Sequence, residues 1–100
     1  MPSTRDAATA SPLLSPPPAQ AQVSPAVQLA QASRALWAAT LSLMTAYMQT
    51  RAPAHRFLLA RRIARNFTTL CRQDCFDPDC RASFERLAAR WQQCAERNRH

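Results

Sequence analysis

Four cysteines and two histidines are the residues of this chain best suited to covalent or metal chemistry: Cys71, Cys75, Cys80, Cys94, His55 and His100. Three residues separate Cys71 from Cys75 and four separate Cys75 from Cys80, whereas structural zinc sites rest on closely paired cysteines. Cys71 and Cys94 fall on apolar stripes, where a thiol behaves as a small hydrophobic group. We therefore predict packing thiols, no metal and no cofactor. A disulfide or a metal site stays open as the alternative, and a Cys75–Cys80 bridge would require an oxidising compartment.

Catalytic machinery is hard to assemble from these side chains. Cys75 with His55 could act as a nucleophile–base pair, but the sequence specifies neither a third orienting group nor a pocket for a substrate. The chain contains no glycine, which removes every glycine-rich loop that cradles phosphate groups. We predict that the protein is not an enzyme and has no small-molecule substrate.

Arginine is the abundant charged residue: the chain has thirteen arginines and no lysine, and its net charge is +7. No acidic residue interrupts the six arginines from Arg51 to Arg72. Arginine binds phosphate with two parallel hydrogen bonds, so this segment is a candidate for contact with nucleic acid or another anion. The alternative is a solvated face whose arginines reflect a GC-rich coding bias. The candidate anion-binding residues are Arg61, Arg62, Arg65 and Arg72.

The length of 100 residues allows one small domain. Residues 1–24 consist mainly of alanine, proline, serine and glutamine, with three consecutive prolines at 16–18. We predict that this segment is a disordered arm, because it offers little apolar surface to bury. Residues 25–100 are then left to form the domain.

Prolines mark the start of three helices in that domain. Ser24 and Pro25 supply an N-cap and a first-turn proline, and Asp77 and Pro78 repeat the pattern. Pro53 ends one helix and begins the next. Apolar residues recur at helical spacing and do not alternate with a period of two. We therefore predict an all-α fold, a small bundle of three antiparallel helices at about 25–50, 53–73 and 78–97.

Each predicted helix has an apolar stripe for the core. In the second helix the stripe is Ala60, Ile63, Ala64, Phe67, Leu70 and Cys71. In the third helix it is Cys80, Phe84, Leu87, Trp91 and Cys94. The first helix has two neighbouring stripes, and the second of them comprises Trp37, Leu41, Met44 and Met48. So wide an apolar face indicates either a central place in the bundle or a partner surface. The candidate interface residues are Trp37, Met44, Tyr47 and Met48.

We predict a non-enzymatic protein–protein interaction or self-association module, whose partner is another protein or a second copy of the chain. The alternative is a nucleic-acid-binding accessory protein that uses the arginine-rich face. We expect no integral membrane helix, because the longest uncharged stretch of the domain, residues 35–50, has sixteen residues where a span needs about 20. A cytoplasmic location with reduced thiols is expected. Stretches such as HRFLLARRIARNF resemble small bacterial proteins but indicate no particular family.

Overall fold

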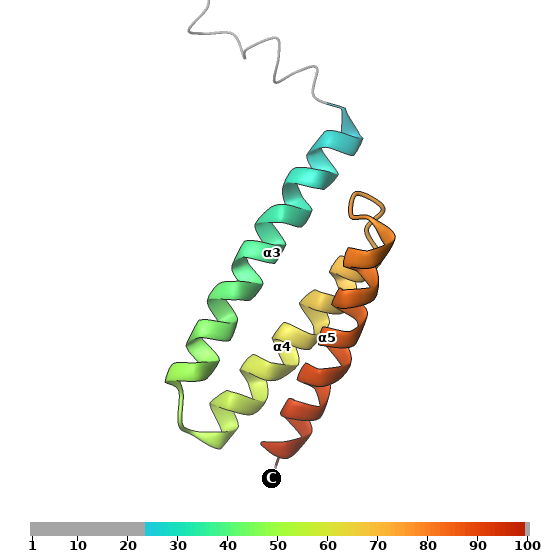
Figure 1. The fold of residues 1–100 in the computed structure, drawn as a ribbon. Coiled ribbons are helices and arrows are strands. Elements are labelled where there is room, and N and C mark those ends of the chain that lie inside the picture. The colour runs from blue at the N-terminus through green and yellow to red at the C-terminus, as the bar shows by residue number, and fades with distance from the viewer. Residues whose placement is uncertain (1–23, 100) are drawn as a thin grey trace, which may run out of the picture.

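The computed structural model describes residues 24–99, and this part of the chain is three α-helices with no strand. The helices are α3 (Pro25–Gln49), α4 (Pro53–Cys71) and α5 (Pro78–Arg97), as Figure 1 shows. The prediction of an all-α three-helix fold is confirmed. Each helix begins at the predicted proline, and α4 ends two residues before the predicted position. The predicted arm lies outside the described residues except for Ser24.

Side-chain caps explain why α3 and α5 begin where they do. Ser24 Oγ accepts a hydrogen bond from the backbone N–H of Val27 at 3.2 Å, and Asp77 Oδ1 accepts one from that of Cys80 at 2.8 Å. These bonds satisfy backbone donors that have no partner within the helix. The bond from Cys80 also lowers the pKa of the Asp77 carboxyl, because it favours the charged form.

The turn between α3 and α4 is held by Arg56. Its Nη1 atom donates to the carbonyl oxygens of Tyr47 at 3.2 Å and of Thr50 at 2.9 Å, at the end of α3 where carbonyls lack helical partners. The guanidinium carbon lies 3.9 Å from the centre of the Tyr47 ring. Arg56 is thus a structural arginine, and only three residues connect the two antiparallel helices.

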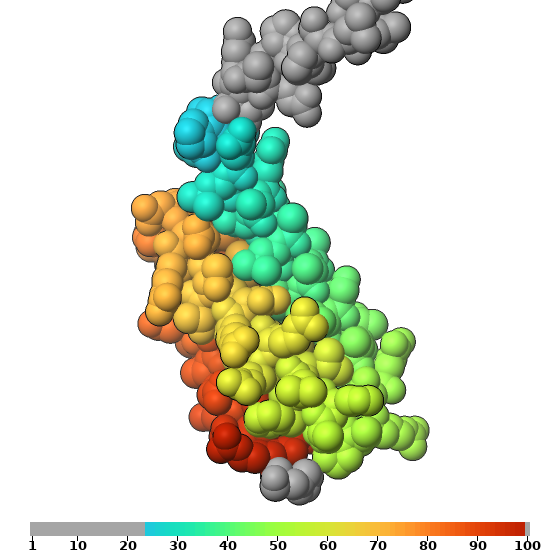
Figure 2. Space-filling view, turned by 180° about the vertical axis from the view of Figure 1, so that it is seen from behind, coloured from blue at the N-terminus to red at the C-terminus, as the bar shows by residue number. Residues whose placement is uncertain are grey.

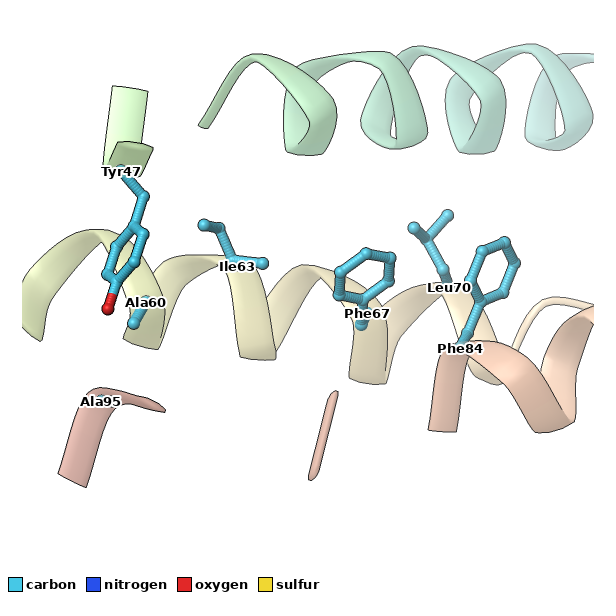
Figure 3. Packing of buried hydrophobic residues seen from close by; sticks show 7 residues of the cluster. All are labelled: Tyr47, Ala60, Ile63, Phe67, Leu70, Phe84 and Ala95. Carbon is cyan, nitrogen blue, oxygen red and sulfur yellow. The ribbon is translucent and has the colours of Figure 1, made fainter. Parts of the chain in front are cut away.

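Helix α4 lies between the other two helices and supplies most of the core (Figures 2 and 3). The predicted stripe of α4 is confirmed, because five of its residues are buried and Cys71 is half-buried. Phe67 is fully buried at its centre, with its ring 5.9 Å from that of Phe84 and 5.8 Å from that of Trp37. The buried apolar residues are Tyr47, Ala60, Ile63, Ala64, Phe67, Leu70, Phe84 and Ala95.

Helices α3 and α5 run in the same direction on either side of α4, and their backbones do not pack against each other (Figure 1). Aromatic side chains bridge them instead: the rings of Trp37 and Phe84 are 5.3 Å apart, and those of Tyr47 and Trp91 are 5.0 Å apart. The bundle therefore buries the second stripe of the first helix only in part: Trp37 and Met44 pack against the core, whereas Leu41 and Met48 stay exposed.

The backbone is regular throughout residues 24–99. Within that range every residue has a negative φ and no peptide bond is cis. None of the helices that the structure describes combines the length and the apolar character that a membrane crossing needs.

Candidate functional site

Within residues 24–99, the cysteines and His55 do not assemble into one site, and His100 lies outside the described residues. Cys75 follows α4 and His55 lies in its first turn, so the length of the helix alone separates them by about 24 Å. No disulfide joins the four cysteines, and among residues 24–99 no three histidine, cysteine or acidic side chains are grouped as metal ligands. Desolvation raises the pKa of the Cys80 thiol, and the charge of Asp77 adds to the effect, which disfavours the thiolate.

Tyr47, a predicted interface residue, is part of the core. It is 5% exposed, and its hydroxyl shares a 2.9 Å hydrogen bond with Cys94 Sγ. The same oxygen accepts a hydrogen bond from Asn98 Nδ2, also at 2.9 Å. Tyr47 therefore ties α3 to the last turn of α5, and its burial leaves almost none of its surface for contact with a partner.

The three other interface candidates share one side of α3, which faces α5. Helical spacing places Trp37, Met44 and Met48 on this side together with Leu41. Trp37 and Met44 are half-buried against the core, whereas Met48 is 72% exposed and Leu41 is 44% exposed. The stripe thus begins in the core at Trp37 and emerges at the surface toward Met48.

Two hollows lie on the same side of the molecule, along α5. One has a volume of about 410 Å³ and is lined by Trp37 of α3 and by Phe84 and Leu87 of α5. The other, of about 350 Å³, is lined by Ser83, Leu87 and two arginines of α5. They share Ser83 and Leu87, so they form one shallow depression. We call this surface the α3–α5 groove. Its hollows are lined by Trp37 of α3 and by Ser83, Arg86, Leu87 and Arg90 of α5, among others. Helical spacing continues its α3 edge from Trp37 to Leu41, Met44 and Met48, which line neither hollow.

The rim of the α3–α5 groove is charged unevenly. Arg86 and Arg90 line one hollow, and Asp77 and Asp79 line the end of the other at the start of α5. Helix α3 contributes no acidic residue to either rim. The groove therefore has an apolar floor, a cationic middle and a short acidic end.

The predicted anion-binding arginines are divided by the fold. Arg65 and Arg72 line a second groove, between α4 and α5, and Arg61 lines a neighbouring hollow beside Phe57. All four candidates are exposed, but Arg62 is turned by about 100° from Arg61 and lies on the flank of α4 nearer to α3. Glu85 lies in the second groove with Arg65 and Arg72.

Sequence reasoning missed the α5 side of the α3–α5 groove. Leu87 was assigned to the core stripe, yet it is only half-buried and lines both hollows. Arg86 and Arg90 stand one turn apart beside it, a spacing visible in the sequence. These arginines lie at the rim of the groove only because of where α3 lies relative to α5. The periodicity of the sequence does not predict that position.

Comparison with known proteins assigns no function to these surfaces. The chain matches no protein-family model, no curated protein and no solved structure.

Proposed function

We propose that the protein is a non-enzymatic interaction module, and that its α3–α5 groove binds one amphipathic helix of a partner protein. The observation that supports this most directly is that Leu41 and Met48 are exposed on the same stripe of α3 as Trp37, which lines a hollow together with Leu87 of α5. An apolar groove between two parallel helices accepts the apolar face of a third helix, whose side chains at i, i+3 or i+4 and i+7 enter it as anchors. The bound helix would complete a four-helix arrangement.

The composition of the surface supports the same proposal. Methionine, aromatic residues and arginine are enriched at protein interfaces, and the groove combines Trp37, Met44 and Met48 with the arginines of α5. Methionine also adapts its shape to different partners, because its side chain is unbranched and flexible.

A model helix tests this proposal on the full chain. The probe is a peptide of about 20 residues with leucine on one face and alanine and glutamine elsewhere, so that it carries no side-chain charge. Both tryptophans of the chain, Trp37 and Trp91, lie where α3 meets α5, so their emission should change when the peptide binds. We expect Leu41→Glu and Met48→Glu each to raise the Kd at least about tenfold, because binding would bury an unpaired carboxylate.

Leu58→Glu is the matched control for Leu41→Glu. Leu58 lies on α4 outside the groove and is 52% exposed, against 44% for Leu41. We expect Leu58→Glu to leave the Kd within about twofold of the original value. Equal losses in the two variants, with circular dichroism showing both folded, would mean that the peptide binds exposed leucine without preference for the groove.

A second candidate function is nucleic-acid binding through α4. Its support is the set of exposed arginines Arg61, Arg65 and Arg72 on one side of a helix that contains no acidic residue. Glu85 weakens it, because its carboxylate lies in the groove that Arg65 and Arg72 line.

The nucleic-acid alternative predicts that the double variant R61E/R65E loses binding to short duplex DNA. Each phosphate contact that disappears should also reduce the slope of log Kd against log salt by about one. The measurement is fluorescence anisotropy of labelled DNA at several salt concentrations. R86E/R90E is the control of equal charge, and equal losses in both variants would show general attraction by a basic protein rather than a site on α4.

A further inference from the structure

We propose that the helix bound in the α3–α5 groove carries acidic side chains on its flank, and that Arg86 and Arg90 select it. This inference rests on the proposed function, and it adds the chemistry of the partner. Arg86 and Arg90 are exposed and both line the hollow at Leu87. Carboxylates of the bound helix above that hollow would form ion pairs with these two arginines at the edge of the apolar contact. Such ion pairs contribute more to the specificity of binding than to its affinity.

The two arginines are available for such pairs. Within residues 24–99 the ion pairs of the structure are Arg81 with Asp74 and Arg99 with Glu96, and neither involves the groove arginines. Arg86 Nη2 donates to Ser83 Oγ at 3.2 Å, which leaves its other donors free. Most of the guanidinium group can therefore receive a carboxylate from outside the chain.

The spacing of the arginines specifies a helical partner. Arg86 and Arg90 are one turn apart, which places them about 6 Å apart along the axis of α5. Two acidic residues at i and i+4 of a bound helix have the same separation. Arg97 follows on the same flank of α5, seven residues after Arg90, and would meet a third acid two turns further along.

The charge layout also orients the partner's acids along the groove. Asp77 and Asp79 line the groove at the start of α5 and would repel acidic side chains there. Acidic residues of the partner are therefore favoured over the middle and the C-terminal half of α5. An acid-free or basic segment belongs at the other end.

A second copy of the chain fits the groove less well than an acidic helix does. The exposed apolar stripe of a copy lies on α3, which has Arg34 as its one charged residue and no acid. Two copies also repel each other overall, since each has a net charge of +7. Charge complementarity thus favours a partner of opposite sign.

Two further peptides test this inference on the full chain. They keep the leucine face of the uncharged peptide and carry glutamate or lysine at i, i+4 positions of the flank. At low salt we expect the original chain to bind the glutamate peptide about tenfold more tightly than the uncharged peptide, which has glutamine at these positions. The lysine peptide should bind most weakly. The preference should shrink at high salt because the rim is exposed to solvent. R86E/R90E should reverse the preference, whereas R61E/R65E, with the same change in net charge, should keep it.

Each other outcome overturns the inference in a recognisable way. Equal loss of preference in R86E/R90E and R61E/R65E would show that net charge alone attracts the acidic peptide. Equal binding of the glutamate and glutamine peptides, with Leu41→Glu still weakening both, would overturn the inference and leave the proposed function standing. A chain that light scattering shows to be a dimer, and that Leu41→Glu makes monomeric, would identify a second copy as the occupant. A monomer that binds none of the peptides would overturn both proposals.

Discussion

Phe67→Ala is expected to leave much of the chain unfolded at room temperature. Phe67 is fully buried at the centre of α4, and its ring packs against Trp37 of α3 and Phe84 of α5. Replacing a buried phenylalanine with alanine removes apolar contact and leaves a cavity, at a cost of about 3–5 kcal/mol. That is comparable to the stability of about 3–5 kcal/mol that a single core supplies to a domain of this size. One side chain thus holds all three helices.

Urea denaturation followed by circular dichroism measures this loss, and Leu58→Ala is the control. Both changes shorten an apolar residue of α4, but Leu58 is 52% exposed and has no place in the core. Leu58→Ala should change the free energy of unfolding by no more than about 0.5 kcal/mol. If Phe67→Ala unfolds at the same urea concentration as Leu58→Ala, the three helices are not joined through Phe67.

Tyr47→Ala is expected to have the second largest effect on stability, again of about 3–5 kcal/mol. Tyr47 reaches from α3 across the end of α4 toward α5, as Figure 3 shows. Truncation removes the ring that packs against Trp91 and beneath Arg56, and it removes the hydroxyl partner of Asn98. Because α3 and α5 meet only through side chains, this loss releases one end of the bundle.

Tyr47→Phe separates the hydroxyl from the ring. This variant keeps the aromatic contacts and removes the hydrogen bonds to Cys94 and Asn98, for a smaller cost of about 1 kcal/mol. Thermal unfolding of the two variants beside the original chain gives both contributions. If Tyr47→Phe costs as much as Tyr47→Ala, the hydrogen bonds rather than the packed ring hold this end together.

The fold was largely predictable because local sequence features determine where each helix begins. Pro25, Pro53 and Pro78 set the helix starts, and the apolar stripe of α4 identifies the element that the core surrounds. The stripe of α5 was predicted less well: Cys80 is exposed, and Ala95, which the stripe omits, is fully buried. A small residue is buried where helices approach closely, and the apolar periodicity of one helix does not show where that happens.

Only the α3 side of the candidate site could be predicted from the sequence. The α3 stripe was visible in the sequence, and Met48 and Leu41 are exposed in the structure. Tyr47 has the same amphipathic character as an interface residue, and its burial depends on Cys94 and Asn98, about fifty residues away along the chain. The rim at Arg86 and Arg90 depends likewise on the parallel placement of α3 and α5, which follows from packing on α4 rather than from any local pattern.

The regular backbone makes this bundle a practical scaffold for protein engineering. Every residue from 24 to 99 has a negative φ angle, a region that is open to L-amino acids in general, so no position in this range depends on glycine. The groove positions Leu41, Met48, Ser83 and Leu87 can therefore be randomised together without backbone strain. A library of that kind would redirect the groove to new helical partners, with the α4 core held constant.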